Sequence, residues 1–157
     1  MGQVCSLEEV LKFVERERQK KKKIVFTNGC FDLLHVGHIR YLQEAKNQGD
    51  FLVVALNTDA SVQKLKGPTR PIQNENDRAE ILAALACVDA TFLFSEETPE
   101  KVIHAIHPDV LVKGGDWKIN QIVGSDFVLS YGGQVKSLNF VDGKSTTSLI
   151  EKSKNKS

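Results

Sequence analysis

Signs of disulfides, of membrane spans and of a strong charge of one sign are all missing from this sequence, and each absence excludes a class of protein. The three cysteines, Cys5, Cys30 and Cys87, are odd in number and widely scattered, so they indicate neither a disulfide framework nor a CxxC redox site. No apolar run is long enough to cross a bilayer, and the N-terminus has no apolar signal core. A formal net charge of +1 gives no indication of binding to nucleic acid or to a membrane. We therefore expect a protein of the reducing cytoplasm.

The length of the chain fits one folded domain. Its 157 residues and 41% hydrophobic content are enough to bury a full core, and no internal repeat divides them. The composition suggests three segments: an N-terminal helix with a basic linker over residues 1–22, a main domain over residues 23–152, and a polar tail over residues 153–157.

Expected strands and helices alternate along the chain. The continuous apolar run from Phe51 to Asn57 predicts a strand that is buried on both faces. Ser6 and Glu9 form a capping-box pattern for an N-terminal helix with Leu7, Val10, Leu11 and Val14 on one face. We expect further strands at residues 24–26, 90–94, 109–113 and 134–138, and further helices at 35–49, 76–86, 99–106, 121–131 and from 145 onward. This order predicts an α/β fold: a single-domain, Rossmann-like, doubly wound parallel sheet with helices on both faces and a ligand over the carboxyl ends of its strands.

Two histidines follow the first expected strand. Asn28 and Gly29 predict a turn after that strand, and His35 and His38 stand at the start of the next helix. Residues three apart share a helix face, so both imidazoles can point at one ligand. The helix N-terminus also offers unpaired N–H groups and a positive dipole end to an anion. Gly37 costs about 1 kcal/mol of helix stability relative to alanine, but its lack of a side chain would let a nucleotide lie on the first turn.

A second pair with the same spacing serves as an internal control. His104 and His107 stand at the end of an expected helix, just before Pro108, where the helix dipole favours histidine and no ligand is needed. We therefore place the functional site at the first pair. A zinc site there is not indicated, because no third His, Cys or acidic ligand lies nearby at a metal-binding spacing.

Four segments of the sequence resemble a known family. His35 to His38 resembles the HxGH signature of the nucleotidyltransferase superfamily, and Gly29 to His38 is similar to its cytidylyltransferase-like branch. Lys64 to Pro71, Val112 to Trp117 and Asp142 to Thr147 extend the resemblance to the heptose 1-phosphate adenylyltransferases of that branch, and it runs from Lys23 to Ile150. The resemblance makes residues 23–152 the nucleotidyltransferase domain. It implies transfer of AMP from ATP to D-glycero-β-D-manno-heptose 1-phosphate, which yields ADP-heptose and pyrophosphate for lipopolysaccharide core synthesis.

Three other functions remain open from the sequence. A glycerol-3-phosphate cytidylyltransferase and a flavin-nucleotide (FAD) synthetase-like enzyme could use the same scaffold, although Ser148 to Glu151 lacks the arginine that some cytidylyltransferases carry there. A nucleotide-binding regulatory module without turnover is the non-enzymatic alternative, and the intact His35, Gly37 and His38 count against it. The family also implies a homodimer, for which the sequence itself gives no interface signal.

The resemblance assigns roles to residues that mostly follow expected strand ends. It implies that His35 and His38 donate hydrogen bonds to the phosphates, with Lys66 and Asp32 as the other catalytic residues. Mg²⁺ is expected to enter with ATP and to lie near Asp32, because no cage of several carboxylates is visible. The nucleotide-binding set is Thr27, Asn28, Gly29, Cys30, Phe31, Gly37, Lys113, Gly114, Asp116, Asp142, Ser145, Thr146 and Thr147. The set for the sugar 1-phosphate is Asp32, Asn57, Asp59, Arg70, Arg78 and Trp117.

Several of these residues have a structural alternative. The loop from Lys64 to Pro71 carries three cations without an acidic partner, which predicts a lid that is mobile in the free enzyme and ordered by nucleotide; a solvated basic connection is the alternative. Arg78 could bind a phosphate or form a surface ion pair beside Asp77. Trp117 could stack on a ring or pack in the core or in an interface, and the hydroxyls of residues 145–147 could simply cap a helix.

Overall fold

One parallel sheet organises the molecule. The computed structural model describes residues 2–139 and 146–155. Within them, six strands pair in the order β1-β4-β3-β2-β5-β6, and every pair is parallel. The strands are β1 (Gln3–Val4), β2 (Ile24–Gly29), β3 (Phe51–Asn57), β4 (Ala90–Phe94), β5 (Val110–Gly114) and β6 (Gln134–Leu138).

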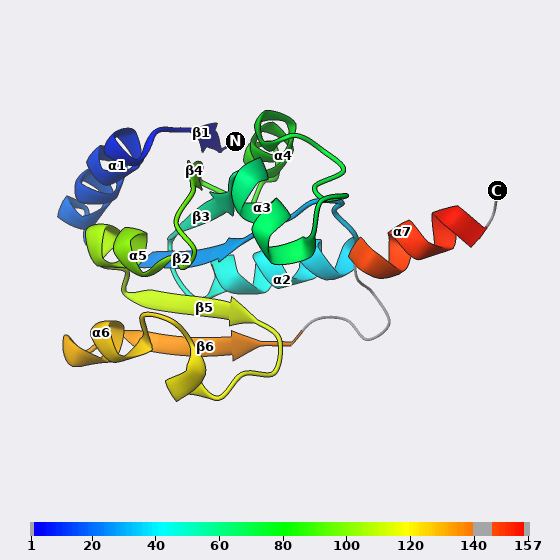
Figure 1. Ribbon diagram of the computed structural model, residues 1–157. Coiled ribbons are helices and arrows are strands. Elements are labelled where there is room, and N and C mark those ends of the chain that lie inside the picture. Colours follow the sequence, from blue (N-terminus) through cyan, green and yellow to red (C-terminus); the bar gives the residue numbers. More distant parts are fainter. Residues whose placement is uncertain (1, 140–145, 156–157) are drawn as a thin grey trace.

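Helices cover both faces of this sheet (Figure 1). Ile24 and Phe26 of β2 belong to one core cluster, whereas Val25 between them belongs to a second, as the pleat of a strand requires. The first cluster includes side chains of α1, α5 and α6, and the second includes side chains of α2 and α4. The doubly wound α/β fold is therefore confirmed. The helices are α1 (Leu7–Gln19), α2 (Val36–Asn47), α3 (Asp59–Lys66), α4 (Glu75–Ala83), α5 (Glu100–Ile106), the 3₁₀ turn η1 (Ile119–Gln121), α6 (Ser125–Ser130) and α7 (Thr146–Asn155).

Most of the expected elements are present, with three corrections. The helix expected at residues 121–131 is shorter, because Gln121 ends the 3₁₀ turn η1 and Gly124, with a φ of 86°, precedes the start of α6 at Ser125. The strands expected at residues 51–57, 90–94 and 134–138 have those bounds, and the Ser6 hydroxyl accepts the Glu9 N–H at the start of α1. The turn expected at Asn28 and Gly29 is wrong, because both residues pair with β3 and extend β2. The loop expected from Lys64 is also wrong at its start, because α3 runs to Lys66 and ends at Gly67, whose φ of 103° suits glycine.

The two ends of the chain extend this fold. β1 pairs with β4 at an edge of the sheet, and Val10 and Val14 of α1 lie in the same core cluster as Phe92. The segment before residue 23 is therefore packed on the domain. α7 begins beside the start of α2 and reaches Asn155, through the first part of the polar tail (Figure 1). Over the described residues, no helix has the length and apolarity needed to span a bilayer.

The strand order creates a switch point at β2. The chain continues from β2 to β3 and β4 on one side, and it then crosses to β5 and β6 on the other side. In open α/β sheets, a crevice forms outside the carboxyl ends of the strands at such a point, and ligands bind there. The expected site therefore lies where β2 leads into α2.

Candidate active site

A cavity of about 580 Å³ occupies this crevice. It receives residues from the carboxyl ends of four neighbouring strands and from the first turns of α2. They include Asn28 and Gly29 at the end of β2 and Cys30 just after it, Asn57 at the end of β3, Phe94 at the end of β4, and Lys113 and Gly114 at the end of β5. His35 and His38 lie on the same wall. The site predicted at the strand ends is thus a cavity large enough for a small ligand.

The geometry of the histidine pair defines its protonation. His35 is the N-cap of α2, and its Nδ1 accepts the Gly37 N–H at 3.0 Å. The Nδ1 of His38 accepts the His35 N–H at 3.3 Å, and the two ring centroids are 3.9 Å apart. A neutral imidazole whose Nδ1 is an acceptor carries its proton on Nε2. Both rings are therefore set to donate from Nε2.

Burial keeps His38 neutral. Removal from solvent, and secondarily the positive charge that His35 can carry, lower the pKa of His38 from 6.5 to about 4. Near neutral pH the ring is consequently a hydrogen-bond donor without a full positive charge. Such a donor can stabilise charge that develops on a phosphate oxygen without forming a tight ion pair with the ground state.

The backbone between β2 and α2 is tightly packed. Phe31 has a φ of 46°, and its ring lies 5.4 Å from that of His38. A Cβ atom on Gly29 would come within 2.8 Å of the Phe31 ring. Any larger residue at position 29 would therefore have to displace the Phe31 ring, which packs beside His38 at the cavity wall.

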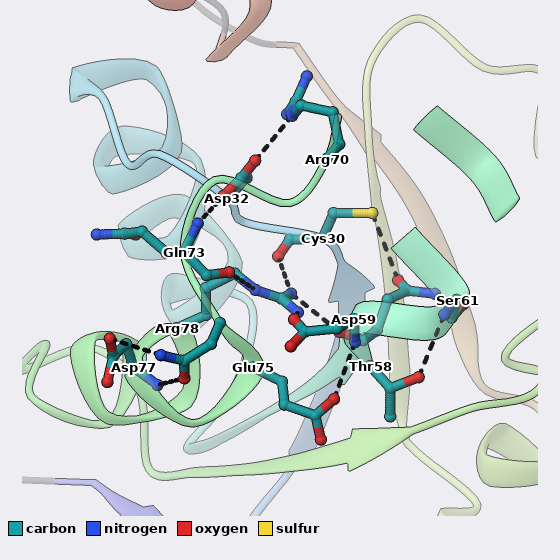
Figure 2. Close-up of polar contacts among 12 residues, drawn as sticks. Cys30, Asp32, Thr58, Asp59, Ser61, Arg70, Gln73, Glu75, Asp77 and Arg78 are labelled. Carbon is teal, nitrogen blue, oxygen red and sulfur yellow. Dashed lines mark hydrogen bonds and ion pairs between the residues drawn. The ribbon is translucent and has the colours of Figure 1, made fainter. Parts of the chain in front are cut away.

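Asp32 is fully engaged by the segment that follows α3. Its carboxylate accepts hydrogen bonds from Arg70 Nε at 2.8 Å and from the backbone N–H of Gln73 at 3.0 Å (Figure 2). It also accepts the backbone N–H of Ile72 at 2.9 Å. Burial raises the pKa of Asp32, but these hydrogen bonds outweigh burial and hold it below its ordinary value. The expectation that the basic loop has no acidic partner is wrong, because Arg70 pairs with Asp32.

The contacts of Asp32 also bear on the expected metal. Only 1% of the Asp32 side chain is exposed, and both of its oxygens already accept hydrogen bonds. Among the described residues, no group of three or more His, Cys, Asp or Glu side chains is arranged to hold a metal ion. Asp32 in this arrangement does not fit as a direct ligand of Mg²⁺.

Three basic side chains face the cavity. Lys66 lies in the last turn of α3, Arg70 follows that helix, and Lys113 is in β5. Burial lowers the pKa of Lys113, and its Nζ lies 5.5 Å from the centre of the Trp117 ring. Lys64 is exposed and lies outside the cavity wall. The wall therefore combines cations with the two imidazole donors, as a phosphate site requires.

Other predicted site residues lie away from the cavity wall. The Thr27 hydroxyl is buried 2.5 Å from that of Tyr41, and Gly37 is buried in α2. Asp59 contacts Arg78, whose side chain is fully buried, so the alternative of a surface ion pair for Arg78 is wrong. Asp116 and Trp117 are exposed, so packing of Trp117 in the core is also wrong. Asp142 and Ser145 lie outside the described residues, as does the Thr146 side chain, whereas Thr147 lines the cavity.

Several residues of the cavity wall were not predicted from the sequence. Tyr41 lies three residues after His38 on α2, so helical periodicity could have identified it. Phe94 ends β4, and the strand-end rule that identified the other segments applies equally to the residues after it. Leu65 and Val123 carry no such signal. The missed lining residues are Tyr41, Leu65, Phe94, Glu97, Thr98, Pro99 and Val123.

The fold and the site define a nucleotide-binding α/β domain with an HxGH motif at the switch point. The chain belongs to the cytidylyltransferase-like family, whose profile matches residues 26–149, and it is a nucleotidyltransferase. It is 55% identical over 147 residues to the bifunctional protein HldE of Syntrophotalea carbinolica, a match that covers 94% of this chain and 29% of that protein. It is 52% identical over 153 residues to HldE of Ectopseudomonas mendocina, covering 98% of this chain and 32% of that protein. The chain thus spans about a third of the length of these relatives.

Solved structures support the same assignment. The lipopolysaccharide core biosynthesis protein of Thermoplasma volcanium has a TM-score of 0.63 and 32% identity, and the match covers 78% of this chain and 99% of that protein. Pantothenate synthetase of Thermus thermophilus has a TM-score of 0.62 at 16% identity over 90% of this chain and 62% of that protein. The second likeness concerns the fold alone.

Proposed function

We propose that this chain transfers AMP from ATP to D-glycero-β-D-manno-heptose 1-phosphate and releases pyrophosphate. The observation that carries the proposal is the pair of Nε2-donor imidazoles at the cavity wall, set by the backbone of α2. The choice of a heptose phosphate rests on the similarity to HldE and to a lipopolysaccharide core biosynthesis protein. The product, ADP-heptose, would then serve lipopolysaccharide core synthesis.

The reaction needs no covalent enzyme intermediate. A phosphate oxygen of the sugar 1-phosphate attacks the α-phosphorus of ATP, and the bond from that phosphorus to the bridging oxygen breaks. Pyrophosphate leaves with the electron pair of the broken bond. The protein has to supply alignment and charge stabilisation. His35 and His38 would donate to the phosphate oxygens as negative charge develops, and loss of one such donor typically costs about 10²–10³ in kcat.

The cations of the wall would neutralise the phosphates. Lys66 and Lys113 approach the cavity from opposite sides of β2, one from α3 and the other from β5. Arg70 would contact the sugar phosphate while Asp32 holds its guanidinium. We assign the outer phosphates of ATP to the start of α7, where Thr147 lines the cavity. Mg²⁺ bound to ATP would supply further charge neutralisation, with its ligands mainly on the nucleotide.

A comparison of substrates tests this proposal. Purified protein is incubated with ATP or CTP and with heptose 1-phosphate or glycerol 3-phosphate, and pyrophosphate release is measured. We expect kcat/KM for ATP to exceed that for CTP by at least about tenfold with the heptose phosphate. A preference for CTP with glycerol 3-phosphate would favour the cytidylyltransferase alternative. Nucleotide binding without pyrophosphate release from any pair would favour the regulatory module.

Two further parts of the proposal concern the oligomeric state of the protein and its location in the cell. We expect a homodimer, as the family resemblance implies, and light scattering coupled to gel filtration would determine the mass in solution. We also expect the enzyme to act in the cytoplasm, where ATP is available.

A further inference from the structure

Arg78 of α4 is the largest fully buried side chain of the described molecule, and its guanidinium has four partners (Figure 2). Nη1 donates to the carbonyl oxygens of Cys30 at 2.7 Å and Asn57 at 2.9 Å. Nε donates to the Gln73 carbonyl at 3.0 Å, and Nη2 donates to the Asp59 carboxylate at 2.7 Å. Its side chain is 0% exposed, so the guanidinium has no open path to a ligand in the cavity.

The four partners belong to three segments: the end of β2, the junction of β3 with α3, and the connection before α4. Cys30 follows β2, Asn57 ends β3, Asp59 begins α3, and Gln73 lies in the connection before α4. The first two segments leave the sheet at the carboxyl ends of β2 and β3, where the strand ladder no longer holds the chain in place, and the third connects two helices. The planar fork of one arginine supplies donors to all of them at fixed angles, which the single ammonium group of lysine cannot do.

The same three segments carry groups of the cavity wall. The segment after Cys30 leads through Asp32 to the histidine pair, and α3 ends with Lys66. The connection that contains Gln73 binds Asp32 through its backbone and brings Arg70 to the wall. Arg78 therefore stands at the junction between the imidazole donors and two of the cations.

We propose that Arg78 is a positioning residue, which fixes the histidine pair relative to Lys66 and Arg70 and does not itself contact substrate. The inference rests on the function proposed above. It replaces the expectation that Arg78 binds the sugar phosphate. In a reaction that depends on alignment, small displacements of the donors lower kcat while the substrates still bind.

The test compares Arg78→Lys and Arg78→Met with Arg40→Lys, a substitution at an exposed arginine of α2. We expect kcat to fall at least about tenfold in Arg78→Lys and about a hundredfold in Arg78→Met, with KM for ATP and for the sugar phosphate within about threefold of the wild type. Arg40→Lys should match the wild type.

An increase in KM for one substrate at unchanged kcat would mean that Arg78 binds that substrate. A lower Tm with unchanged kcat would mean that its role is only structural. Either result overturns the proposal.

A milder variant keeps the test valid if the arginine variants fold poorly. Asp59→Asn removes the charge of one partner but keeps an oxygen acceptor, and its side chain is 36% exposed. We expect a fall in kcat of a few fold with unchanged KM. Unchanged kcat in Asp59→Asn, with the arginine variants unfolded, would count against positioning.

Imidazole NMR separates this inference from the proposed reaction. If the wild type gives no pyrophosphate with any substrate pair, the proposed function fails, but the ring resonances of His35 and His38 can still be compared in the ligand-free protein. We expect them to shift in Arg78→Lys and Asp59→Asn and to stay in place in Arg40→Lys. Resonances that do not move in the first two variants would overturn positioning, whatever the substrate is.

Discussion

Two histidine pairs with the same spacing lie at opposite ends of the sheet. His35 and His38 begin α2 at the carboxyl ends of the strands, and each Nδ1 accepts a backbone N–H. His104 and His107 end α5 just before β5 begins, so they lie near the amino ends. There His104 stacks on Phe127 with centroids 3.8 Å apart, and His107 stacks on Tyr131 at 3.6 Å.

The difference comes from which backbone groups a helix end leaves unpaired. A helix N-terminus has spare N–H donors, which can hold Nδ1 and orient Nε2 toward a ligand. A helix C-terminus has spare carbonyl oxygens, and here the Arg18 guanidinium donates to those of Ile106 and His107. The rings at that end are held by aromatic stacking instead. Spacing alone therefore does not make a histidine pair functional; the polarity of the helix end does.

The strongest test of this comparison removes each ring. His35→Ala and His38→Ala should each lower kcat by at least about a hundredfold, because each deletes an oriented donor, and each should cost about 0.5–2 kcal/mol of stability, because each also deletes a cap of α2 in a protein that still folds. His104→Ala and His107→Ala should leave kcat within about twofold and cost about 0.5–1.5 kcal/mol of stability through lost stacking. Steady-state kinetics and thermal melts of the four variants provide the measurement. Similar losses of kcat at both pairs in folded protein would contradict the assignment.

A second test asks whether a lysine supports turnover because it lies at the cavity or merely because it adds positive charge to α3. Lys66 lines the cavity and Lys64 does not, although both lie in the last turn of α3. We expect Lys66→Met to lower kcat by about tenfold or more, with a smaller effect on binding of the sugar phosphate, and Lys64→Met to have little effect. Kinetics with varied sugar phosphate would measure this.

Limited proteolysis addresses the lid in the same variants. If nucleotide orders the connection after α3, ATP should protect residues 67–71 in the wild type, and less so in Lys66→Met. Equal cleavage with and without ATP, together with full activity of Lys66→Met, would show that the connection is a solvated loop and not a lid.

The smallest expected effect concerns pH and stability. His38 has a pKa of about 4 in the folded protein and about 6.5 when unfolded, so the unfolded chain binds more protons between these values. The contribution of neutral His38 is therefore fully present above pH 6.5 and is lost as the pH falls toward 4. We expect Tm to fall less over this range in His38→Gln than in the wild type, while His104→Gln follows the wild type. Identical pH profiles for His38→Gln and the wild type would show that His38 is not buried as described.

Local patterns were sufficient for most of the fold. Phe51–Asn57 and Ala90–Phe94 were predicted with their bounds, because buried parallel strands are continuous apolar runs. α3 was not predicted, because it is short and Ser61 and Val62 are its only buried residues. Its last three residues, 64–66, fall within the expected basic loop. The edge strand β1 is too short for any periodic pattern, and its pairing with β4 stabilises it.

For the candidate site, the sequence by itself determined most of the segments that reach the cavity, because strand ends and the histidine pair at a helix start are local features; the residues after β4 and Val123 were not among them. The tertiary structure alone decided what each charged side chain does there. Asp32 contacts Arg70 across 38 positions, and Arg78 contacts Cys30 across 48. Such contacts depend on how the crossovers return the chain to the sheet, and no short-range pattern encodes them. For that reason, two residues that were expected to contact ligand, Asp32 and Arg78, instead use their polar atoms in hydrogen bonds to other parts of the chain.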